Sequence, residues 1–221
     1  ALENADYVIN TIQVGGYQPG TVIDFEIPKK YGLKQTIADT LGIGGIMRGL
    51  RTIPVMVDFC REMEKLCPDA WLLNYTNPMA INTGAVLKQT NVKAVGLCHG
   101  IQGSHHWLAR CLDIPYEEVA FIAGGTNHCA WFIKLEHKGE NLYPRLKKMV
   151  AEGADFIKND GVRMEMLMKF GYYGGESSEH LSEYLPYFIR KDHEELIDRF
   201  GVPIDEYIRR CIVQNESWDE L

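Results

Sequence analysis

The sequence predicts an α/β fold, in which a partial, doubly wound parallel sheet is followed by an α-rich portion. In the first half of the chain, short apolar runs rich in β-branched residues alternate with longer segments of helical periodicity. Such alternation with short connections is typical of parallel strands joined by right-handed crossovers. From Tyr143 onward the chain is mostly helical and more charged. We therefore expect the C-terminal part of a Rossmann-like domain over residues 1–125 and part of an α-rich (α+β) domain over 126–221.

The composition is that of a globular protein. With 221 residues and 46% hydrophobic content, the chain can bury a sizeable core. A net charge of −7 without a long basic run argues against nucleic acid as a partner, since phosphate binding needs clustered lysine and arginine. The six cysteines form no CxxC pair, which indicates free thiols and a cytoplasmic location. No apolar run approaches the roughly 20 residues that span a bilayer, so we expect no membrane partner.

The first predicted strand is the apolar, β-branched run Tyr7–Val14, which ends at Gly15 and Gly16. Backbone at such glycines can approach a ligand closely. A polar loop is expected next, over Tyr17–Gly32. A dinucleotide-binding fold normally opens with a strand and a GxGxxG turn, and the chain contains neither that turn nor an initiator methionine. We therefore expect a fragment of a longer protein, truncated at both ends.

The first long helix is predicted over Ile43–Cys67, with Pro54 expected to kink or divide it. Apolar residues at helical spacing form one face of this segment: Met47, Leu50, Ile53, Val57 and Cys60.

A second strand and helix follow at once. The strand is Ala70–Asn74, and Asn77 is placed to cap a helix that reaches about Gln89, with Pro78 at its first position.

The remaining elements continue this pattern and then change it. A third strand is predicted over Lys93–Cys98 and a helix over Ile101–Leu112. Two further strands, Val119–Ala123 and Cys129–Glu136, are expected before the helical region. That region should be broken by glycines at Gly161, Gly171–Gly175 and Gly201.

Polar and reactive side chains follow the predicted strands at the ends where ligands gather in open α/β sheets. Asn74 and Asn77 follow the second strand, and Cys98 and His99 follow the third. With His128, Cys98 offers the thiolate and imidazole that bind transition metals. Spacing alone favours a buried thiol beside a hydrogen-bonded loop histidine over a metal site. For Asn77 it equally allows an asparagine that only caps a helix. Both alternatives stay open at this point.

The run NYTNPMAINT, followed nine residues on by KAVGLC, resembles the signature of family 4 glycoside hydrolases. The resemblance extends over almost the whole chain, through seven blocks in the expected order: VINTIQVGG, ADTLGIGGIMRGLRTIP, LLNYTNPMA, VGLCHG, GTNHCAWF, KLEHKGENLYP and ESSEHLSEYLPYF. Cys98-His99 together with GYYGGESSEH is similar to the α-galactosidase branch. Members that act on 6-phosphorylated glucosides usually carry aspartate after that cysteine.

The resemblance implies a glycosidase that needs NAD and Mn²⁺ or another divalent metal, and NAD-dependent family 4 is an exception to the usual pair of carboxylates. In this mechanism C3 of the sugar is oxidised, the C2 proton is removed, the aglycone leaves by elimination, water adds, and the hydride returns to C3. The implied substrate is a small-molecule α-galactoside, and the implied assembly is a homo-oligomer, either a dimer or a tetramer.

The resemblance also implies roles for individual residues near the sugar. Cys98 and His128 would hold the metal against the C2 and C3 oxygens. Asn77, His128 and His99 would contact the substrate, and His99 is also a candidate general acid, with a supporting role beside the metal as its alternative.

The base that removes the C2 proton would be Tyr184 in EYLPYF, with Glu183 and Tyr187 as alternatives. Because a phenol has an unperturbed pKa near 10, Tyr184 would need a cation close by. Asp39 in ADTLGIGG would lie near the cofactor and the substrate and is a third candidate catalytic residue. The alternative interpretation is a polar loop residue.

The cofactor and specificity residues come from two other segments. Asn10, Gln13, Val14 and Asn74 would line the nicotinamide or ribose site. The residues expected to separate substrates are Glu176, Ser177, Glu179 and His180.

Three other readings remain. The same family contains α-galacturonidases, α-glucuronidases and α-glucosidases, which share most of these blocks. A lactate- or malate-dehydrogenase-like NAD oxidoreductase has a similar nucleotide fold and would need no metal cysteine. A non-catalytic remnant that only binds sugar or metal is the third.

Overall fold

The computed structural model describes residues 2–154 and 160–220, and the chain forms two compact units. The first comprises Ala1–Cys98 and Asp205–Leu221, and the second comprises His99–Ile204. A parallel sheet with helices lies in the first, and an antiparallel sheet with helices lies in the second. The predicted α/β class is therefore confirmed. The division expected near residue 125 differs from that of the compact units.

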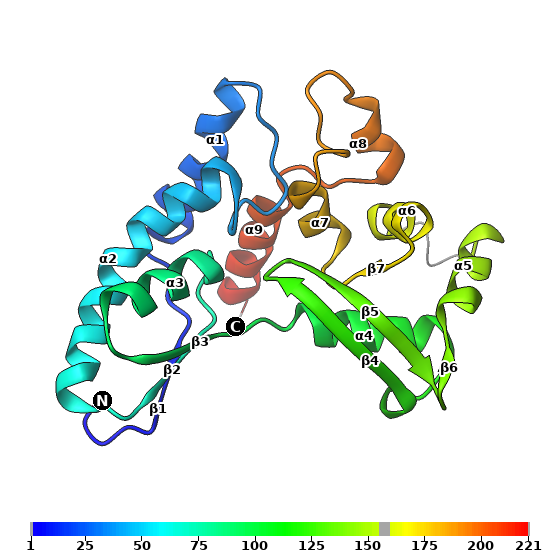
Figure 1. Ribbon diagram of the computed structural model, residues 1–221. Helices are drawn as coiled ribbons and strands as arrows, with labels where there is room; N and C mark the ends of the chain where they lie inside the picture. The colour runs from blue at the N-terminus through cyan, green and yellow to red at the C-terminus, as the bar shows by residue number, and fades with distance from the viewer. Residues whose placement is uncertain (1, 155–159, 221) are drawn as a thin grey trace. The chain divides into compact units, whose positions relative to one another are not determined.

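The parallel sheet of the first unit has three short strands, β1 (Tyr7–Asn10), β2 (Trp71–Asn74) and β3 (Lys93–Gly96), in the order β1-β2-β3 (Figure 1). Asn10 pairs with Asn74, and Asn74 pairs with Gly96. The three strands thus end in register, and the residues that follow them emerge at one edge of the sheet. The parallel pairing predicted from the sequence is confirmed.

The loop expected over Tyr17–Gly32 is wrong. A short π-helical stretch, η1 (Gly16–Thr21), leads directly into the helix α1 (Val22–Lys30). The side chain of Phe25 is buried, and the buried carboxylate of Asp24 accepts two hydrogen bonds from Arg51 at 2.8 and 2.6 Å. These tertiary contacts stabilise a helix whose polar composition and Pro28 were typical of a loop.

Two helices, α2 (Gly42–Leu66) and α3 (Met79–Gln89), lie side by side against this sheet (Figure 1). α2 continues through Pro54 as one helix. Leu72 of β2 packs in the unit's core, together with Met56, Cys60, Met63 and Val86 of the helices. No helix among residues 2–154 and 160–220 is long and apolar enough to cross a bilayer.

The apolar face predicted for α2 is only partly buried. Val57 and Cys60 are buried, but Met47 and Leu50 are 48% and 62% exposed. The N-terminal half of the helix instead buries a polar and glycine-rich side: Gly44, Gly45, Arg48, Gly49 and Thr52.

The start of α3 differs by one residue from the prediction. Pro78 has an extended ψ of 107°, so the helix begins at Met79 and Pro78 is not its first residue. The Oδ1 of Asn77 still accepts a hydrogen bond from the backbone N–H of Met79 at 3.2 Å.

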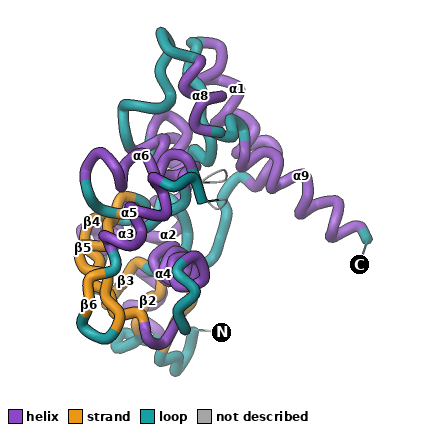
Figure 2. Tube along the Cα trace, turned by 90° about the vertical axis from the view of Figure 1, so that its right-hand side faces the viewer, coloured by secondary structure: helices purple, strands orange, loops and turns teal. Residues whose placement is uncertain are grey.

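The second unit begins with the helix α4 (Gly100–Cys111) and the 3₁₀ turn η2 (Tyr116–Glu118). The strands β4 (Val119–Thr126) and β5 (Cys129–His137) then form an antiparallel hairpin (Figure 2). Two short strands pair with β5, namely β6 (Glu140–Asn141) and β7 (Tyr173–Gly174). Gly125 has φ +140°, and a Cβ there would lie 2.4 Å from the backbone oxygen of Cys129. Only glycine fits beside the hairpin tip.

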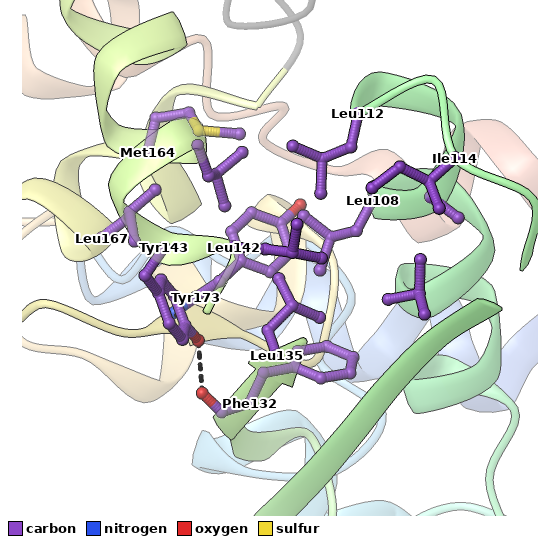
Figure 3. Close-up of a cluster of buried hydrophobic side chains, with 13 residues drawn as sticks. Leu108, Leu112, Ile114, Phe132, Leu135, Leu142, Tyr143, Met164, Leu167 and Tyr173 are labelled. Carbon is purple, nitrogen blue, oxygen red and sulfur yellow. Dashed lines mark hydrogen bonds between the residues drawn. The ribbon is translucent and has the colours of Figure 1, made fainter. Parts of the chain in front are cut away.

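Two apolar clusters hold the helices of the second unit. The larger one packs α4, α5 (Tyr143–Ala151) and α6 (Gly161–Phe170) on β5, and within it the hydroxyl of Tyr143 donates to the carbonyl of Phe132 (Figure 3). The smaller cluster joins α6 to α7 (Ser178–Tyr184) and α8 (Glu195–Phe200).

The helical region breaks where glycines were expected. α6 is bounded by Gly161 and by Gly171 in the left-handed region, and α8 ends at Gly201. The last helix, α9 (Glu206–Asp219), belongs to the first unit.

Candidate functional site

The ends of β1 and β2 are joined by two buried asparagines. The Nδ2 of Asn10 donates to the Oδ1 of Asn74 at 2.8 Å. The Nδ2 of Asn74 donates to the Oγ1 of Thr83 on α3 at 3.0 Å, and its Oδ1 accepts the backbone N–H of Thr76 at 3.0 Å. These bonds fix the strand ends relative to α3. A role for Asn10 and Asn74 in binding a cofactor stays a prediction.

Gln13 and Val14 lie just beyond β1. The Nε2 of Gln13 donates to the Oγ1 of Thr21 at 2.9 Å, and the side chain remains exposed. Val14 is half-buried, and Gly15 follows it with φ +84°. The backbone there takes a conformation that favours glycine and lets another molecule approach closely.

Asp39 and Asn77 meet although they are far apart in the sequence. The Nδ2 of Asn77 donates to the Oδ2 of Asp39 at 2.7 Å. The other carboxylate oxygen of Asp39, Oδ1, is buried without a hydrogen-bond partner in the described part of the chain. Burial raises the pKa of Asp39, and the nearby charge of Arg48 opposes that rise. This carboxylate can therefore accept a hydrogen bond from a hydroxyl group of a ligand.

Arg48 holds this pair in place, and the sequence analysis missed it. Its Nε donates to the backbone carbonyl of Asn77 at 3.2 Å. Its Nη2 lies 3.4 Å from the hydroxyl of Tyr207 on α9, and the guanidinium stacks over that ring at 5.4 Å. One sequence feature could have indicated Arg48, because it is a charged residue between Gly45 and Gly49 in a helix that packs on a sheet.

In the second unit, His128 lies at the tip of the hairpin between β4 and β5, with φ +57° and a buried side chain. Two rings from α7 approach its imidazole edge-on, namely His180 at 4.2 Å and Tyr184 at 6.5 Å between ring centroids. Burial lowers the pKa of His128 to about 3, and the neighbouring His180 and His99 add to the effect. The ring is therefore neutral near pH 7, and neutral imidazole is the form in which histidine binds a metal.

Glu176 and His180 are held close to this histidine by local packing. The Oγ of Ser177 and the Nδ1 of His180 lie 3.0 Å apart. A Cβ built on Gly100 would lie 1.8 Å from the Oε1 of Glu176, so the buried carboxylate occupies the space that this glycine leaves. Gly100 is the first residue of α4 and follows His99, whose side chain is exposed.

The three candidate bases lie in different surroundings. Tyr184 is half-buried, with its ring edge-on to His128. Tyr187 is exposed and stacks on Phe170 at 6.2 Å. Glu183 is half-buried beside Tyr184 on α7. Proximity to His128 favours Tyr184 over Tyr187.

The predicted metal ligands belong to different units. Cys98 closes the first unit, is half-buried and follows β3 by two residues, whereas His128 belongs to the second. Their pairing on one metal ion stays a prediction that rests on the sequence resemblance and on donor chemistry.

Asn127 is a further polar residue that the sequence analysis did not single out. Its Nδ2 is buried and has no hydrogen-bond partner among residues 2–154 and 160–220. Asn127 belongs to the GTNH block, in which only His128 was considered because histidine is the usual metal ligand. A buried amide without a partner beside His128 is a donor suited to a bound ligand.

Two family models together match nearly all of the chain. One, described as family 4 glycosyl hydrolase, matches residues 1–114. The other, described as the C-terminal domain of family 4 glycosyl hydrolase, matches residues 123–220. The gap between these matches lies next to the boundary that was expected near residue 125.

Individual relatives agree with these models. The chain is 54% identical to the α-galactosidase of Bacillus subtilis over 221 residues, which is 100% of this chain and 51% of that protein. It is 39% identical to the α-galactosidase of Rhizobium meliloti, over 88% of this chain and 40% of that protein. The chain thus spans about half the length of the curated relatives it matches, or less.

The fold also matches a solved structure. The 6-phospho-β-glucosidase of Thermotoga maritima, crystallised with manganese, NAD⁺ and glucose-6-phosphate, superposes with a TM-score of 0.75 and 22% identity. The match covers 100% of this chain and 50% of that one.

Proposed function

Because this chain belongs to family 4 of the glycosyl hydrolases, we propose that the protein hydrolyses small-molecule α-galactosides with NAD and a divalent metal ion, Mn²⁺ or a similar one. The observation that carries the proposal is the 54% identity to an α-galactosidase along the whole chain. The NAD⁺ and manganese found with the structural relative support the choice of cofactors. The proposal follows the exception that NAD-dependent family 4 makes to two-carboxylate catalysis.

The residues present fit a divalent metal. Our proposed ligands are Cys98 and His128, whose thiolate and neutral, buried imidazole suit a borderline transition metal. When bound, the metal would stabilise negative charge on the sugar oxygens, and NAD would take up and return the hydride at C3. The protein's own part is to hold the sugar, to move the C2 proton and to place the cofactor.

Asn77 and Asp39 are our proposed sugar contacts in the first unit. The buried Oδ1 of Asp39 has no hydrogen-bond partner among residues 2–154 and 160–220, and a sugar hydroxyl would supply one. The Nε of Arg48 donates to the backbone carbonyl of Asn77, and the side-chain amide of Asn77 donates to Asp39. His99, which is exposed at the start of α4, is our proposed general acid or substrate contact, and His128 would contact the sugar as well.

The carboxyl ends of the parallel strands fit NAD in the way that open α/β sheets bind ligands. We propose Gln13 and Val14 beside the nicotinamide or ribose, because Gln13 is exposed beyond β1 and Gly15 gives the backbone close access. Asn10 and Asn74 would support the cofactor site without touching the cofactor directly, because their amides hydrogen-bond each other and Thr83 of α3.

Sugar release from a panel of substrates tests the proposed function. The whole protein should hydrolyse a chromogenic α-galactoside in the presence of NAD and Mn²⁺, and activity should fall to background when either is withheld. The 6-phosphorylated α-glycosides should be poorer substrates. Faster release from an α-galacturonide, an α-glucuronide or an α-glucoside would contradict the substrate assignment. NADH accumulation without sugar release would instead support a dehydrogenase, and binding without turnover would support a non-catalytic remnant.

We also propose that the protein is a homo-oligomer, and the exposed apolar face of α2 supports this. Four side chains on its first three turns are 43% to 62% exposed: Ile43, Ile46, Met47 and Leu50. Such clusters of exposed apolar side chains mark association surfaces.

We propose a cytoplasmic location for the protein. The six free cysteines support it, because free thiols are typical of a reducing compartment.

Leu50→Glu is expected to lower the oligomeric state by placing a charge on this face. Light scattering coupled to size exclusion should show a smaller mass at unchanged circular dichroism. Leu87→Glu is the matched control, because Leu87 is a similarly exposed leucine, at 54%, on the neighbouring helix α3. Equal dissociation by both variants, or by neither, would contradict a role for the α2 face.

A further inference from the structure

We propose that Asp160 and Arg163 are positioning residues, whose buried ion pair fixes the N-terminus of α7 and thereby holds His180 and Tyr184 against His128. This inference rests on the proposed function, because it concerns side chains assigned to that site. It adds a group of residues that neither the sequence pattern nor the proposed chemistry required.

The carboxylate of Asp160 is the centre of the arrangement. It is 1% exposed and accepts three side-chain hydrogen bonds. Oδ1 accepts from the Nε of Arg163 at 2.5 Å and from the Oγ of Ser178 at 2.8 Å. Oδ2 accepts from the hydroxyl of Tyr173 at 2.7 Å. The carboxylate therefore joins α6, β7 and the first residue of α7.

Arg163 extends the same network to α4. The residue is 7% exposed, and its Nη1 donates to the Oγ of Ser104 at 2.8 Å. Its guanidinium also stacks on two rings, at 5.0 Å from Trp107 and 4.7 Å from Tyr173. Four elements of the second unit thus meet at one ion pair.

Stability alone is a weak explanation for such a pair. The cost of removing two charges from water offsets most of their attraction, and well-packed apolar residues of similar volume are often as stable. The pair also fixes the orientation of the groups that it joins, because hydrogen bonds have a defined geometry. A buried pair with this many directed contacts is suited to placing an element precisely.

Ser178 is the residue through which the ion pair forms hydrogen bonds with α7. Its Oγ donates to Asp160 and accepts the backbone N–H of Arg163 at 3.3 Å. A further contact of α7 is apolar, through Leu181 in the cluster with Val162 and Phe188. Apolar packing is non-directional, so it holds the helix close without fixing its rotation or its axial position.

Rotation of α7 matters because His180 and Tyr184 lie one helical turn apart, on the same side of the helix. A slip of one residue would turn both side chains by about 100°. The two hydrogen bonds at Ser178 oppose this slip from the residue where the helix begins.

The test compares two serines of the same helix. Ser178→Ala removes both bonds to the ion pair. Ser182→Ala is the control, because Ser182 is buried and its hydroxyl donates to the carbonyl of Glu179 within α7. Both are measured in the whole protein for thermal unfolding, Mn²⁺ affinity by calorimetry, and kcat and KM. Ser178→Thr keeps the hydroxyl and should restore the wild-type values.

We expect Ser178→Ala to bind Mn²⁺ about 10-fold more weakly and to lose more in kcat than in KM, in the range typical of residues that support metal ligands. Ser182→Ala should show a comparable shift in unfolding temperature without these losses. If the two alanine variants are alike in Mn²⁺ affinity and kcat, the positioning role is wrong.

A second measurement separates this inference from the proposed function. NMR signals of the His128 and His180 ring protons report their mutual placement without substrate, NAD or metal. They should shift in Ser178→Ala and stay unchanged in Ser182→Ala. Unshifted signals in Ser178→Ala would contradict the positioning role even in an active enzyme. A wild-type protein without Mn²⁺ binding or sugar release would instead contradict the proposed function.

Discussion

Replacing Tyr184 with phenylalanine is expected to lower kcat for α-galactoside hydrolysis by about 10²- to 10⁴-fold, which is the usual contribution of a general base. The phenol is our proposed base for the C2 proton. Its ring lies edge-on to His128 at 6.5 Å, so a metal held by that imidazole would be a nearby cation that favours the phenolate. Phenylalanine keeps the ring and removes only the oxygen. Steady-state kinetics with a chromogenic α-galactoside measure the loss.

Tyr187→Phe is the matched control for this prediction. It removes the same atom three residues further on, from a ring that stacks on Phe170, and kcat should stay within about twofold of the wild type because surface changes away from the chemistry have small effects. Exchange of the C2 proton with deuterated solvent gives a second readout, which should disappear in Tyr184→Phe alone. Retained exchange in that variant would assign the base elsewhere, with Glu183 the next candidate.

The sequence predicted the parallel sheet well because its signal is local. Each strand is a short apolar run followed by polar residues, and the register that brings Asn10 and Asn74 together follows from parallel pairing. The helix α1 was missed for the opposite reason. Its stability depends on the burial of Phe25 and on the pairing of Asp24 with Arg51, 27 residues away, and no local pattern records such a contact.

The same distinction applies to the candidate site. The family resemblance named Asn77, Asp39, His128 and Tyr184 individually, but the Asp39–Asn77 hydrogen bond spans 38 residues. The approach of α7 to the hairpin tip likewise depends on how the second unit packs. Spacing along the chain contains none of this information.

Asp160 and Arg163 are the clearest example of residues whose surroundings cannot be predicted from the local sequence. In a charged, helical region, two residues at i and i+3 are typical of a solvated helix surface. Only the structure shows that apolar and aromatic side chains bury them. Charged residues that are nearly inaccessible to water are rare unless they are paired, and for that reason their removal should have a large effect.

Replacing Arg163 with alanine is expected to lower the free energy of unfolding by about 3–5 kcal/mol at neutral pH, because it leaves the buried carboxylate of Asp160 without its countercharge. Burial raises the pKa of Asp160, and Arg163 opposes that rise. In Arg163→Ala the pKa of Asp160 should therefore rise further above the ordinary value of an aspartic acid. The free energy of unfolding of Arg163→Ala is then lowest at a pH where Asp160 is ionised. Part of the lost stability is recovered as the pH falls below the folded-state pKa of Asp160.

Urea unfolding of the wild type and of Arg163→Ala at about pH 7 and about pH 5 measures both effects, since linkage predicts a smaller difference at the lower pH. The double variant Asp160→Asn with Arg163→Met is the control, because it removes both charges and keeps most of the volume. It should recover much of the lost stability, as replaced buried pairs often do. A pH-independent loss, or a double variant no more stable than Arg163→Ala, would attribute the effect to the cavity left by the side chain and not to the unpaired charge.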